Sequence, residues 1–436
     1  MGIKGLPKLI SDITGNAAIR TYKFSKFKGK GWSVSVDASL MIHQTVIAMR
    51  STGKDMKNNK GELTSHLHGL FYKILIFLEN SMIPIFVFDG KAPELKNKTI
   101  EKRTSRKSKA EKKLKELSDS EGEEYIKTFK QTFKPTKDNI HEVQVMLDLM
   151  GIPFIVAPGE ADVVCAWMAA RHDANGKRYV KGVCSDDSDM LALGAPYLFK
   201  DMLRFMSKNK PIKIISLDKA LVKMNLTMKQ FVDLCVLLGT DYCENIKGIG
   251  PKNAFKLIRQ YGTLEKVLAF LNKKNKIVDD SDDDDNLENN DHMTNEQCML
   301  AAKKYFNNAL KEIDESNFVP SNDQLQLRKF QYEELMDFMC VKHNFDVERI
   351  QTGINRLTEY YKNMDVTREN TKKVHKILQP RSENYIFKAL IEDIDFLPSE
   401  EETEEPMPSK KTTKKNIIKK TKIIDNPKEI PKKSLK

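Results

Sequence analysis

Apolar and polar positions along the first half of the chain predict short strands that alternate with helices. Four apolar runs rich in β-branched or aromatic residues each end at an acidic or turn residue and lead into a helical pattern. These runs are residues 32–36, 84–88, 154–157 and 179–184. Strands that alternate with helices pair in parallel, so we expect an α/β fold with a central, mostly parallel sheet flanked by helices. Amphipathic helices predicted at 63–80 and 138–150 fit this order.

Acidic residues follow each of the four predicted strands. They are Asp37, Asp89, the pair Glu160 and Asp162, and the pair Asp187 and Asp189. The carboxyl ends of parallel strands lie together, so these side chains would converge on one edge of the sheet. For one such pair a role as helix cap or first-turn residue is the better explanation, but four strands that all end this way favour a metal site. Two Mg²⁺ ions about 4 Å apart would suit these oxygen ligands and could drive phosphodiester hydrolysis.

Two further segments carry features that suit phosphate groups. Residues 91–137 are dense in Lys and Arg and poor in apolar residues, so they form either a solvated helix or a helical flap that becomes ordered against phosphates. Farther along, Gly248 and Gly250 precede a predicted helix, and Lys247 and Lys252 flank them. A helix N-terminus exposes backbone N–H groups, so we expect this hairpin to hold duplex backbone without reading bases.

Composition narrows the class of partner. The chain has 436 residues, a formal net charge of +12 and a pI near 9.1, which indicates a polyanionic partner. We expect nucleic acid and no membrane, because no apolar run is long enough to span a bilayer. The six cysteines show no CxxC spacing and resemble the reduced thiols of an intracellular protein, and no signal peptide is visible.

Two polar stretches have low complexity. Residues 272–296 contain an Asp-rich run that we expect to be disordered, and they lack the Gly and the terminal Glu of a Ca²⁺-binding loop. From about residue 400 the chain is rich in Lys and dotted with Pro, which is typical of a nuclear signal or of a nucleic-acid-binding arm.

A set of short motifs occurs in a fixed order along residues 1–357. They are 1–6 (MGIKGL), 36–39 (VDAS), 87–91 (VFDGK), 157–162 (APGEAD), 187–189 (DSD), 237–243 (LLGTDYC), 248–252 (GIGPK) and 338–340 (FMC). Each motif alone is weak, but together they closely resemble the flap endonuclease family of structure-specific 5′ nucleases. The short spacing between the Asp89 and Glu160 motifs resembles flap endonucleases, because their nucleotide-excision-repair relatives carry a long insertion there.

The resemblance implies a PIN-like nuclease fold and a two-metal site. It implies that two Mg²⁺ ions, for which Mn²⁺ is a substitute, are held by Asp37, Asp89, Glu160, Asp162, Asp187, Asp189 and Asp241. One ion would help to form the attacking hydroxide, and the other would stabilise the leaving oxygen. Lys96 and Arg103 match basic residues at the foot of a helical gateway, where they would stabilise charge in the transition state.

The resemblance also implies how DNA is bound. The segment 91–137 is similar to the gateway and cap through which a 5′ flap threads. The hairpin at Gly248 and Gly250, with Lys247 and Lys252, is similar to a helix-two-turn-helix that binds duplex phosphates and a potassium ion.

Three residues and one loop in the N-terminal region bear on the same interface. Arg50 and Lys73 match positions that contact the DNA backbone. His43 stands where the family usually has a Tyr that stacks on a base, and imidazole stacks less strongly. The loop 58–62 is less acidic than the family's block beside its 3′-flap pocket, which weakens the case for a strict one-nucleotide 3′-flap preference.

We therefore expect one nuclease core with two polar additions. The expected parts are an N-terminal nuclease region 1–105, the gateway 91–137, an internal nuclease region 138–265 with the helix-two-turn-helix at about 230–260, an acidic insertion 272–296, C-terminal helices 299–357 and a basic, largely disordered tail 358–436. The expected activity is Mg²⁺-dependent cleavage of 5′ flaps at their junction with duplex, with 5′–3′ exonuclease activity as a lesser mode, in DNA replication and repair.

Two alternatives remain open at this point. An exonuclease-1-like enzyme would share the same carboxylates, and a non-catalytic scaffold could bind DNA junctions without cleaving them. We expect a monomer that acts in the nucleus or at a viral replication site. The tail lacks the Gln-x-x-aliphatic-x-x-aromatic-aromatic motif, which argues against sliding-clamp binding.

Overall fold

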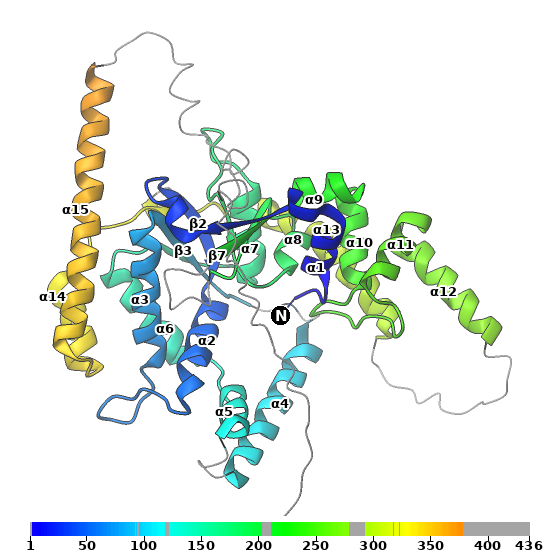
Figure 1. The fold of residues 1–436 in the computed structure, drawn as a ribbon, viewed down its shortest axis with the longest axis horizontal. Helices are drawn as coiled ribbons and strands as arrows, with labels where there is room; N and C mark the ends of the chain where they lie inside the picture. Colours follow the sequence, from blue (N-terminus) through cyan, green and yellow to red (C-terminus); the bar gives the residue numbers. More distant parts are fainter. Residues whose placement is uncertain are drawn as a thin grey trace, which may run out of the picture.

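A seven-stranded sheet forms the centre of the molecule (Figure 1). The computed structural model describes residues 2–91, 93, 96–117, 122–202, 211–278, 293–316, 318–321 and 323–377. The strands are β1 (Ile19–Lys23), β2 (Trp32–Asp37), β3 (Met82–Phe88), β4 (Phe154–Val156), β5 (Gly182–Cys184), β6 (Tyr197–Lys200) and β7 (Pro211–Ser216). Their spatial order is β1-β7-β6-β5-β2-β3-β4.

Five neighbouring strands of the sheet run parallel, and four of them were predicted from the sequence. β6, β5, β2, β3 and β4 pair in parallel, whereas β7 pairs antiparallel with both β6 and β1. Val36 of β2 lies opposite Phe86 of β3 and Cys184 of β5, and Phe88 of β3 lies opposite Val156 of β4. The carboxyl ends of the four predicted strands therefore meet at one edge of the sheet.

Both faces of the sheet are covered by helices. The α-helices are α1 (Leu6–Thr14), α2 (Ala38–Met49), α3 (Ser65–Glu79), α4 (Asn97–Glu116), α5 (Gly122–Gln131), α6 (Lys137–Leu149), α7 (Ala161–Ala170), α8 (Asp189–Ala192), α9 (Leu217–Met224), α10 (Met228–Leu237), α11 (Pro251–Tyr261), α12 (Leu264–Val278), α13 (Asn295–Glu315), α14 (Tyr332–Met336) and α15 (Val347–Ile377). Short 3₁₀ turns and a π-helical turn, Asp337–Lys342, connect some of them.

Two hydrophobic cores lie on opposite faces of the sheet. Along β3, Ile85 and Val87 belong to one core, whereas Phe86 and Phe88 belong to the other. This alternation is the period of a strand that is buried on both faces, and it explains why the predicted strands are continuous apolar runs. The first core includes residues of α1, α7, α10 and α13, and the second includes residues of α2, α3, α6 and α15.

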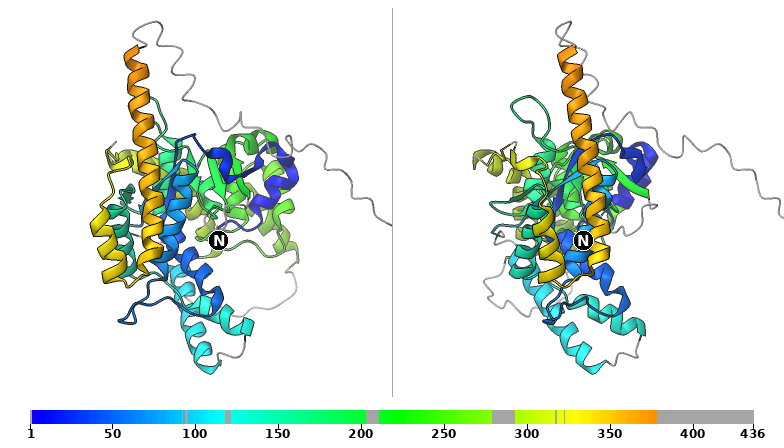
Figure 2. Two further views of the ribbon diagram at one scale, coloured as in Figure 1. Left: turned by 60° about the vertical axis from the view of Figure 1, so that its left-hand side comes forward. Right: turned by 90° about the vertical axis from the view of Figure 1, so that its left-hand side faces the viewer.

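Helices α4 and α5 form a hairpin that extends from the body below the carboxyl edge of the sheet (Figures 1 and 2). Helix α4 is rich in Lys and Arg and has no wide apolar face, and Ala110 is its one buried residue among those whose side chains are described. The segment 91–137 thus forms a helical projection, of which residues 92, 94, 95 and 118–121 lie outside the described part.

Two helices extend past the segment boundaries that were predicted from the sequence. Helix α15 continues to Ile377, twenty residues past the boundary expected at 357, and rises beyond the body as a long helix (Figure 2). Helix α12 continues to Val278, inside the segment 272–296 that was expected to be disordered. Residues 279–292 and 378–436, which hold the Asp-rich run and the basic tail, lie outside the described residues. Among the helices that are described, none is both long and apolar enough to cross a membrane.

Candidate active site

The predicted carboxylates gather at the carboxyl edge of the sheet. A cavity of about 1630 Å³ lies between this edge and the α4–α5 hairpin. Five of the predicted carboxylates line it, namely Asp37, Asp89, Asp162, Asp187 and Asp241. The other two, Glu160 and Asp189, are buried beside it and interact electrostatically with Asp162 and Asp187 respectively. The structure thus brings all seven predicted carboxylates together.

Backbone hydrogen bonds fix several of these side chains. Asp37 caps α2, since its Oδ1 accepts a hydrogen bond from Leu40 N at 3.0 Å. Asp89 Oδ1 accepts from Ala161 N at 3.0 Å, which ties the end of β3 to the start of α7. Asp187 Oδ1 accepts from Asp189 N at 2.9 Å. Each of these bonds engages one carboxylate oxygen, so a helix-capping role is compatible with the predicted role as a metal ligand.

Glu160 is held by side chains instead of backbone amides. Its Oε1 forms an ion pair with Lys96 Nζ. Its Oε2 accepts hydrogen bonds from the hydroxyls of Tyr242 at 2.6 Å and Tyr305 at 2.5 Å. Burial raises the pKa of Glu160, but Lys96 and the two hydroxyls outweigh it, so the net pKa is lowered.

Tyr305 was not among the site residues predicted from the sequence. It lies on α13, 145 positions from Glu160, and no motif marks it. Tyr242 was visible only as a member of the LLGTDYC motif. The sole signal of a role for either residue is their convergence in space.

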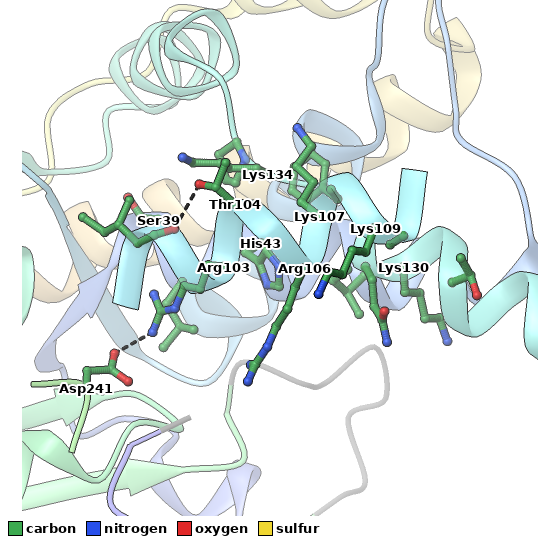
Figure 3. A pocket seen from close by; sticks show the side chains of 18 of the residues that line it. Ser39, His43, Arg103, Thr104, Arg106, Lys107, Lys109, Lys130, Lys134 and Asp241 are labelled. Carbon is green, nitrogen blue, oxygen red and sulfur yellow. Dashed lines mark hydrogen bonds and ion pairs between the residues drawn. The ribbon is translucent and has the colours of Figure 1, made fainter. Parts of the chain in front are cut away.

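Lys96 and Arg103 lie at the foot of α4, as the resemblance implied. Burial lowers the pKa of Lys96, but the charges of Glu160, Asp162 and Asp241 raise it by more, so Lys96 stays protonated. Arg103 Nη2 lies 2.5 Å from Asp241 Oδ2, and about half of its side chain is exposed (Figure 3). The foot of α4 also holds the loop after α10 through a hydrogen bond from Thr99 Oγ1 to the Asp241 carbonyl.

Burial and mutual repulsion act on three of the carboxyl groups. Burial, followed by the charge of Asp89, raises the pKa of Asp37 to about 7. Burial raises the pKa of Asp162 and of Asp189 well above the ordinary range, with Asp37 as the next cause for Asp162 and Asp187 for Asp189. Close negative charges of this kind are relieved by cations.

The residues fit divalent cations with oxygen ligands. The Oδ1 atoms of Asp162 and Asp189 are buried and have no hydrogen-bond partner among the described residues. The set contains only carboxylates, the donors that Mg²⁺ prefers. In this conformation the described His, Cys, Asp and Glu side chains form no group of three close enough to enclose an ion, and Lys96 and Arg103 pair with Glu160 and Asp241.

Basic side chains cover the other side of the cavity. They are Arg103, Arg106, Lys107, Lys109, Lys113, Lys127, Lys130 and Lys134. Figure 3 shows Arg106, Lys109 and Lys130 directed from α4 and α5 into the same space. The basic wall of this cavity suits a polyanion, and the carboxylates of the opposite wall suit metal ions that bind together with it.

His43 also lines this cavity. Its ring lies 5.9 Å from that of Phe133, tilted by 33°, and the two rings offer a partly apolar surface near the carboxylates. Burial lowers the pKa of His43, and the charges of Arg103 and Arg50 lower it further, so its imidazole is neutral at pH 7.

Arg50 and Lys73 lie inside the protein in the described conformation. Arg50 is 7% exposed; it pairs with both carboxylate oxygens of Asp55, at 2.8 and 2.7 Å, and donates to Phe129 O at 2.9 Å. Lys73 is 2% exposed and donates to Thr45 Oγ1 at 2.9 Å. Burial lowers the pKa of Lys73 to about 8. In this conformation neither side chain is exposed to a ligand, so their predicted contacts with the DNA backbone stay predictions.

The predicted phosphate hairpin is exposed. Lys247, Gly248, Gly250 and Lys252 all lie on the surface at the start of α11. Gly250 precedes Pro251, the first residue of α11, and no side chain caps this helix N-terminus. A Cβ atom at Gly248 or Gly250 would meet no atom within 4 Å, so the backbone there is open to a ligand.

Comparison with known proteins relates this site to characterised ones. Residues 1–110 match the family model of the XPG N-terminal domain, and residues 151–241 match that of the XPG I-region. Flap endonuclease 1 of Bos taurus is 37% identical over 360 residues, which cover 82% of this chain and 87% of the bovine protein. The Homo sapiens protein is 36% identical with the same coverage. The solved structure of flap endonuclease-1 from Methanococcus jannaschii is 26% identical with a TM-score of 0.56, and the match covers 83% of this chain and 100% of that one.

Proposed function

This chain belongs to the flap endonuclease family, and from that premise we propose that the cavity beneath α4 and α5 cleaves 5′ flaps at their junction with duplex DNA. As a member of the family it is a structure-specific 5′ nuclease, a hydrolase that acts on the phosphodiester bonds of DNA. We propose 5′–3′ exonuclease activity as its lesser mode.

One observation supports this proposal most strongly. The carboxylates at the sheet edge and the basic side chains of the α4–α5 hairpin face each other across a single cavity. Cleavage of a phosphodiester uses both features. The basic side chains bind the phosphates of the strand, and the acidic side chains hold metal ions at the bond that is cleaved. A scaffold that only bound junctions would have no use for seven converging buried or half-buried carboxylates, since their repulsion destabilises the fold.

The acidic wall is our candidate for the metal site. Asp37, Asp89, Glu160, Asp162, Asp187, Asp189 and Asp241 would hold two Mg²⁺ ions, for which Mn²⁺ could substitute. When bound, two such ions activate water and neutralise charge on the leaving oxygen. The unpartnered oxygens of Asp162 and Asp189 are the first candidates for ligands, since they have no competing hydrogen bond among the described residues.

Lys96 and Arg103 are our candidates for catalytic cations. Lys96 is kept protonated by the carboxylates around it, so its ammonium can donate to a phosphate oxygen that gains charge. Arg103 pairs with Asp241 at the cavity wall, and its half-exposed side chain is able to exchange this partner for a phosphate. Both residues thus bring fixed positive charge to the bond that breaks.

The duplex beside the flap would lie on the α11 hairpin. The exposed backbone at Gly248 and Gly250, flanked by Lys247 and Lys252, suits phosphate oxygens and a potassium ion. At the cavity, His43 would stack on a base near the cleaved bond. Contacts of Arg50 and Lys73 with the DNA backbone would require their side chains to leave their present partners.

The setting of the reaction follows from the same premise. We propose that the protein acts as a monomer on branched DNA in replication and repair, in the nucleus or at a viral replication site. The basic tail, which follows α15 and lies outside the described residues, would add affinity for DNA without a sliding-clamp motif.

The substitution Asp187→Ala tests the proposal. We expect it to lower Mg²⁺-dependent cleavage of a 5′ flap by at least about a thousandfold, while binding of the same flap in Ca²⁺ is retained. Binding by gel shift and cleavage by denaturing gel are measured on one preparation. Asp148→Ala is the matched control, because Asp148 forms an exposed ion pair with Arg328 outside the cavity. Cleavage by Asp187→Ala at the wild-type rate would show that the metal site lies elsewhere.

A further inference from the structure

Tyr305 brings a distant helix into the acidic wall of the cavity. It lies on α13, and its hydroxyl donates to Glu160 Oε2 at 2.5 Å. We propose that Tyr305 is a positioning residue for the nuclease reaction, which holds the Glu160 carboxylate, and through it the Lys96 ammonium, in the orientation that cleavage requires. This inference rests on the proposed function of the cavity.

Glu160 depends on side chains to a degree that the other carboxylates do not. Asp37, Asp89 and Asp187 each accept a hydrogen bond from a backbone amide, which fixes one of their oxygens. Glu160 is the N-cap residue of α7, yet its side chain accepts no capping hydrogen bond. The orientation of its carboxylate is therefore set by its three side-chain donors, of which Tyr305 supplies one.

The two tyrosines form one unit against Glu160. The rings of Tyr242 and Tyr305 lie 4.7 Å apart and are tilted by 48°, and both hydroxyls donate to the same oxygen, Oε2. This leaves Oε1 for the ammonium of Lys96, which lies 5.8 Å from the centre of the Tyr242 ring. With both oxygens engaged, rotation of the carboxylate would break at least one charge-assisted hydrogen bond.

The orientation of the Glu160 carboxylate affects the reacting groups through Lys96. Glu160 Oε1 pairs with the Lys96 ammonium, which lines the cavity. A carboxylate held in place by the two hydroxyls therefore also keeps this ammonium at the cavity wall. Partners that orient a ligand or a catalytic cation from behind change activity by about 10- to 100-fold in metal enzymes when they are removed.

The first residue of α13 also contacts the site. Asn295 exchanges two hydrogen bonds of 3.0 Å with the backbone N–H and C=O of Glu244. Glu244 follows Asp241 in the same loop, and it also pairs with Lys102 of α4. Helix α13 therefore supports both Glu160 and the Asp241 loop, although none of its residues belongs to a recognised motif.

A purely structural role for Tyr305 makes a different prediction from a positioning role. A buried tyrosine hydroxyl usually finds an acceptor, and the loss of that bond alone would lower stability without a selective change in rate. The substitution Tyr305→Phe keeps the ring in its packing against Tyr242 and Phe306 and removes only the hydroxyl. It therefore separates the two roles.

The experiment compares Tyr305→Phe with the wild-type full chain on a 5′ flap. We expect the single-turnover rate in saturating Mg²⁺ to fall about fivefold, less than a full loss of positioning because Tyr242 still donates to the same oxygen. The flap dissociation constant in Ca²⁺ should not change. Calorimetric titration of the DNA-free protein with Mg²⁺ should give an affinity about threefold weaker than that of the wild type.

Two controls sharpen the result. Tyr361→Phe removes another buried hydroxyl bond, the 3.0 Å contact with Met150 O, far from the cavity, and should leave both the rate and the Mg²⁺ affinity unchanged. In a Glu160→Gln background, Tyr305→Phe should cause less than about a twofold further loss of rate, since the group that it positions is already altered.

The outcomes are distinct for the two proposals. If Tyr305→Phe matches the wild type in both rate and Mg²⁺ affinity, the positioning role is overturned. An equal additional loss in the Glu160→Gln background would also overturn it, because Tyr305 would then act independently of Glu160. If the wild type itself does not cleave flaps, the proposed function fails, and the Mg²⁺ titration still decides the role of Tyr305.

Discussion

Single carboxylates in this protein serve a local and a shared role at once. Asp37 caps α2, and Asp89 accepts from the first amide of α7, as any acidic residue at the start of a helix would. Burial, followed by the charges of neighbouring carboxylates, raises the pKa of Asp37 to about 7 and those of Asp162 and Asp189 well above their usual range. Each residue thus stabilises its own helix while their mutual repulsion destabilises the folded protein.

The raised pKa values predict how metal binding changes stability with pH. Because the pKa of Asp37 is about 7 in the folded state, whereas an unfolded Asp titrates near its ordinary pKa of 3.8, the folded state binds more protons between these values. In metal-free protein, stability from these groups is therefore present below about pH 4 and is lost as the pH rises toward 7. We expect Mg²⁺ to raise the melting temperature more at about pH 8 than at about pH 5.

Scanning calorimetry with and without Mg²⁺ checks this prediction. Asp37→Asn provides the comparison, since an amide oxygen can still accept the hydrogen bond from Leu40 N but carries no charge. The metal-free variant should show a flatter dependence of stability on pH. Equal shifts in melting temperature at both pH values would contradict the idea that cations relieve the repulsion.

At the residue scale, site residues whose position follows from the local sequence could be predicted. Site residues that reach the cavity only through the packing of distant elements could not. The six carboxylates at strand exits could be predicted because a short apolar run followed by Asp or Glu has one simple interpretation in a parallel sheet. Tyr305 could not, since its only distinguishing property is the position of α13 relative to α7. The burial of Arg50 was equally hidden, because its partners Asp55 and Phe129 come from two other segments.

At the element scale, the α4–α5 hairpin depends on a few contacts for its position. Helix α4 is polar on nearly all sides, so an apolar face does not fix it to the body. Arg50, from the end of α2, donates to the carbonyl of Phe129 and to Thr132 Oγ1 at the end of α5, and its guanidinium lies 4.2 Å from the centre of the Phe129 ring. Arg50 thus anchors the hairpin to the nuclease core.

The substitution Arg50→Met tests this anchor. It leaves the largely buried Asp55 carboxylate unpaired, so we expect the free energy of unfolding to fall by about 3 kcal/mol. Limited proteolysis should also cleave between residues 97 and 131 faster than in the wild type, since α5 loses its attachment. Urea denaturation and mass spectrometry of the fragments give the two readings.

The control for this prediction is Arg171→Met. Arg171 pairs with Asp314 at 2.7 Å, but both side chains are more than a third exposed, so its loss should cost less than about 1 kcal/mol. If Arg50→Met is as stable as the wild type and loses only affinity for DNA, Arg50 is a DNA contact, as the family resemblance implied, and the anchor is excluded.

The elements themselves were predictable to different degrees. The four parallel strands followed from apolar runs that are buried on both faces of the sheet. The antiparallel strands β1 and β7 were not located, because their short, partly exposed sequences, such as Ile19–Lys23, lack such a run. The length of α15 was missed because its last turns lie beyond the body, so no core-facing pattern marks where the helix ends.

At the scale of the whole molecule, the N-terminal segment joins the cavity to the α11 hairpin. A Cβ atom at Gly2 would lie 2.1 Å from Asp187 Oδ1, and one at Gly5 would lie 2.7 Å from Pro251 Cγ. Both glycines have positive φ angles, so the chain passes between the acidic wall and the start of α11 in a form that only glycine adopts readily. This segment therefore connects the proposed cleavage site with the proposed duplex-binding hairpin, and we expect it to keep the two at a fixed separation.

Cleavage of a 5′-labelled double-flap DNA in Mg²⁺, mapped to the nucleotide beside a nicked duplex, tests the central claim most directly. A fixed separation between the α11 hairpin and the carboxylates predicts a single cut at the flap junction or one nucleotide inside it. A ladder of mononucleotides from the nick would contradict this claim and favour an exonuclease. Retained binding without any product would instead identify a junction-binding scaffold.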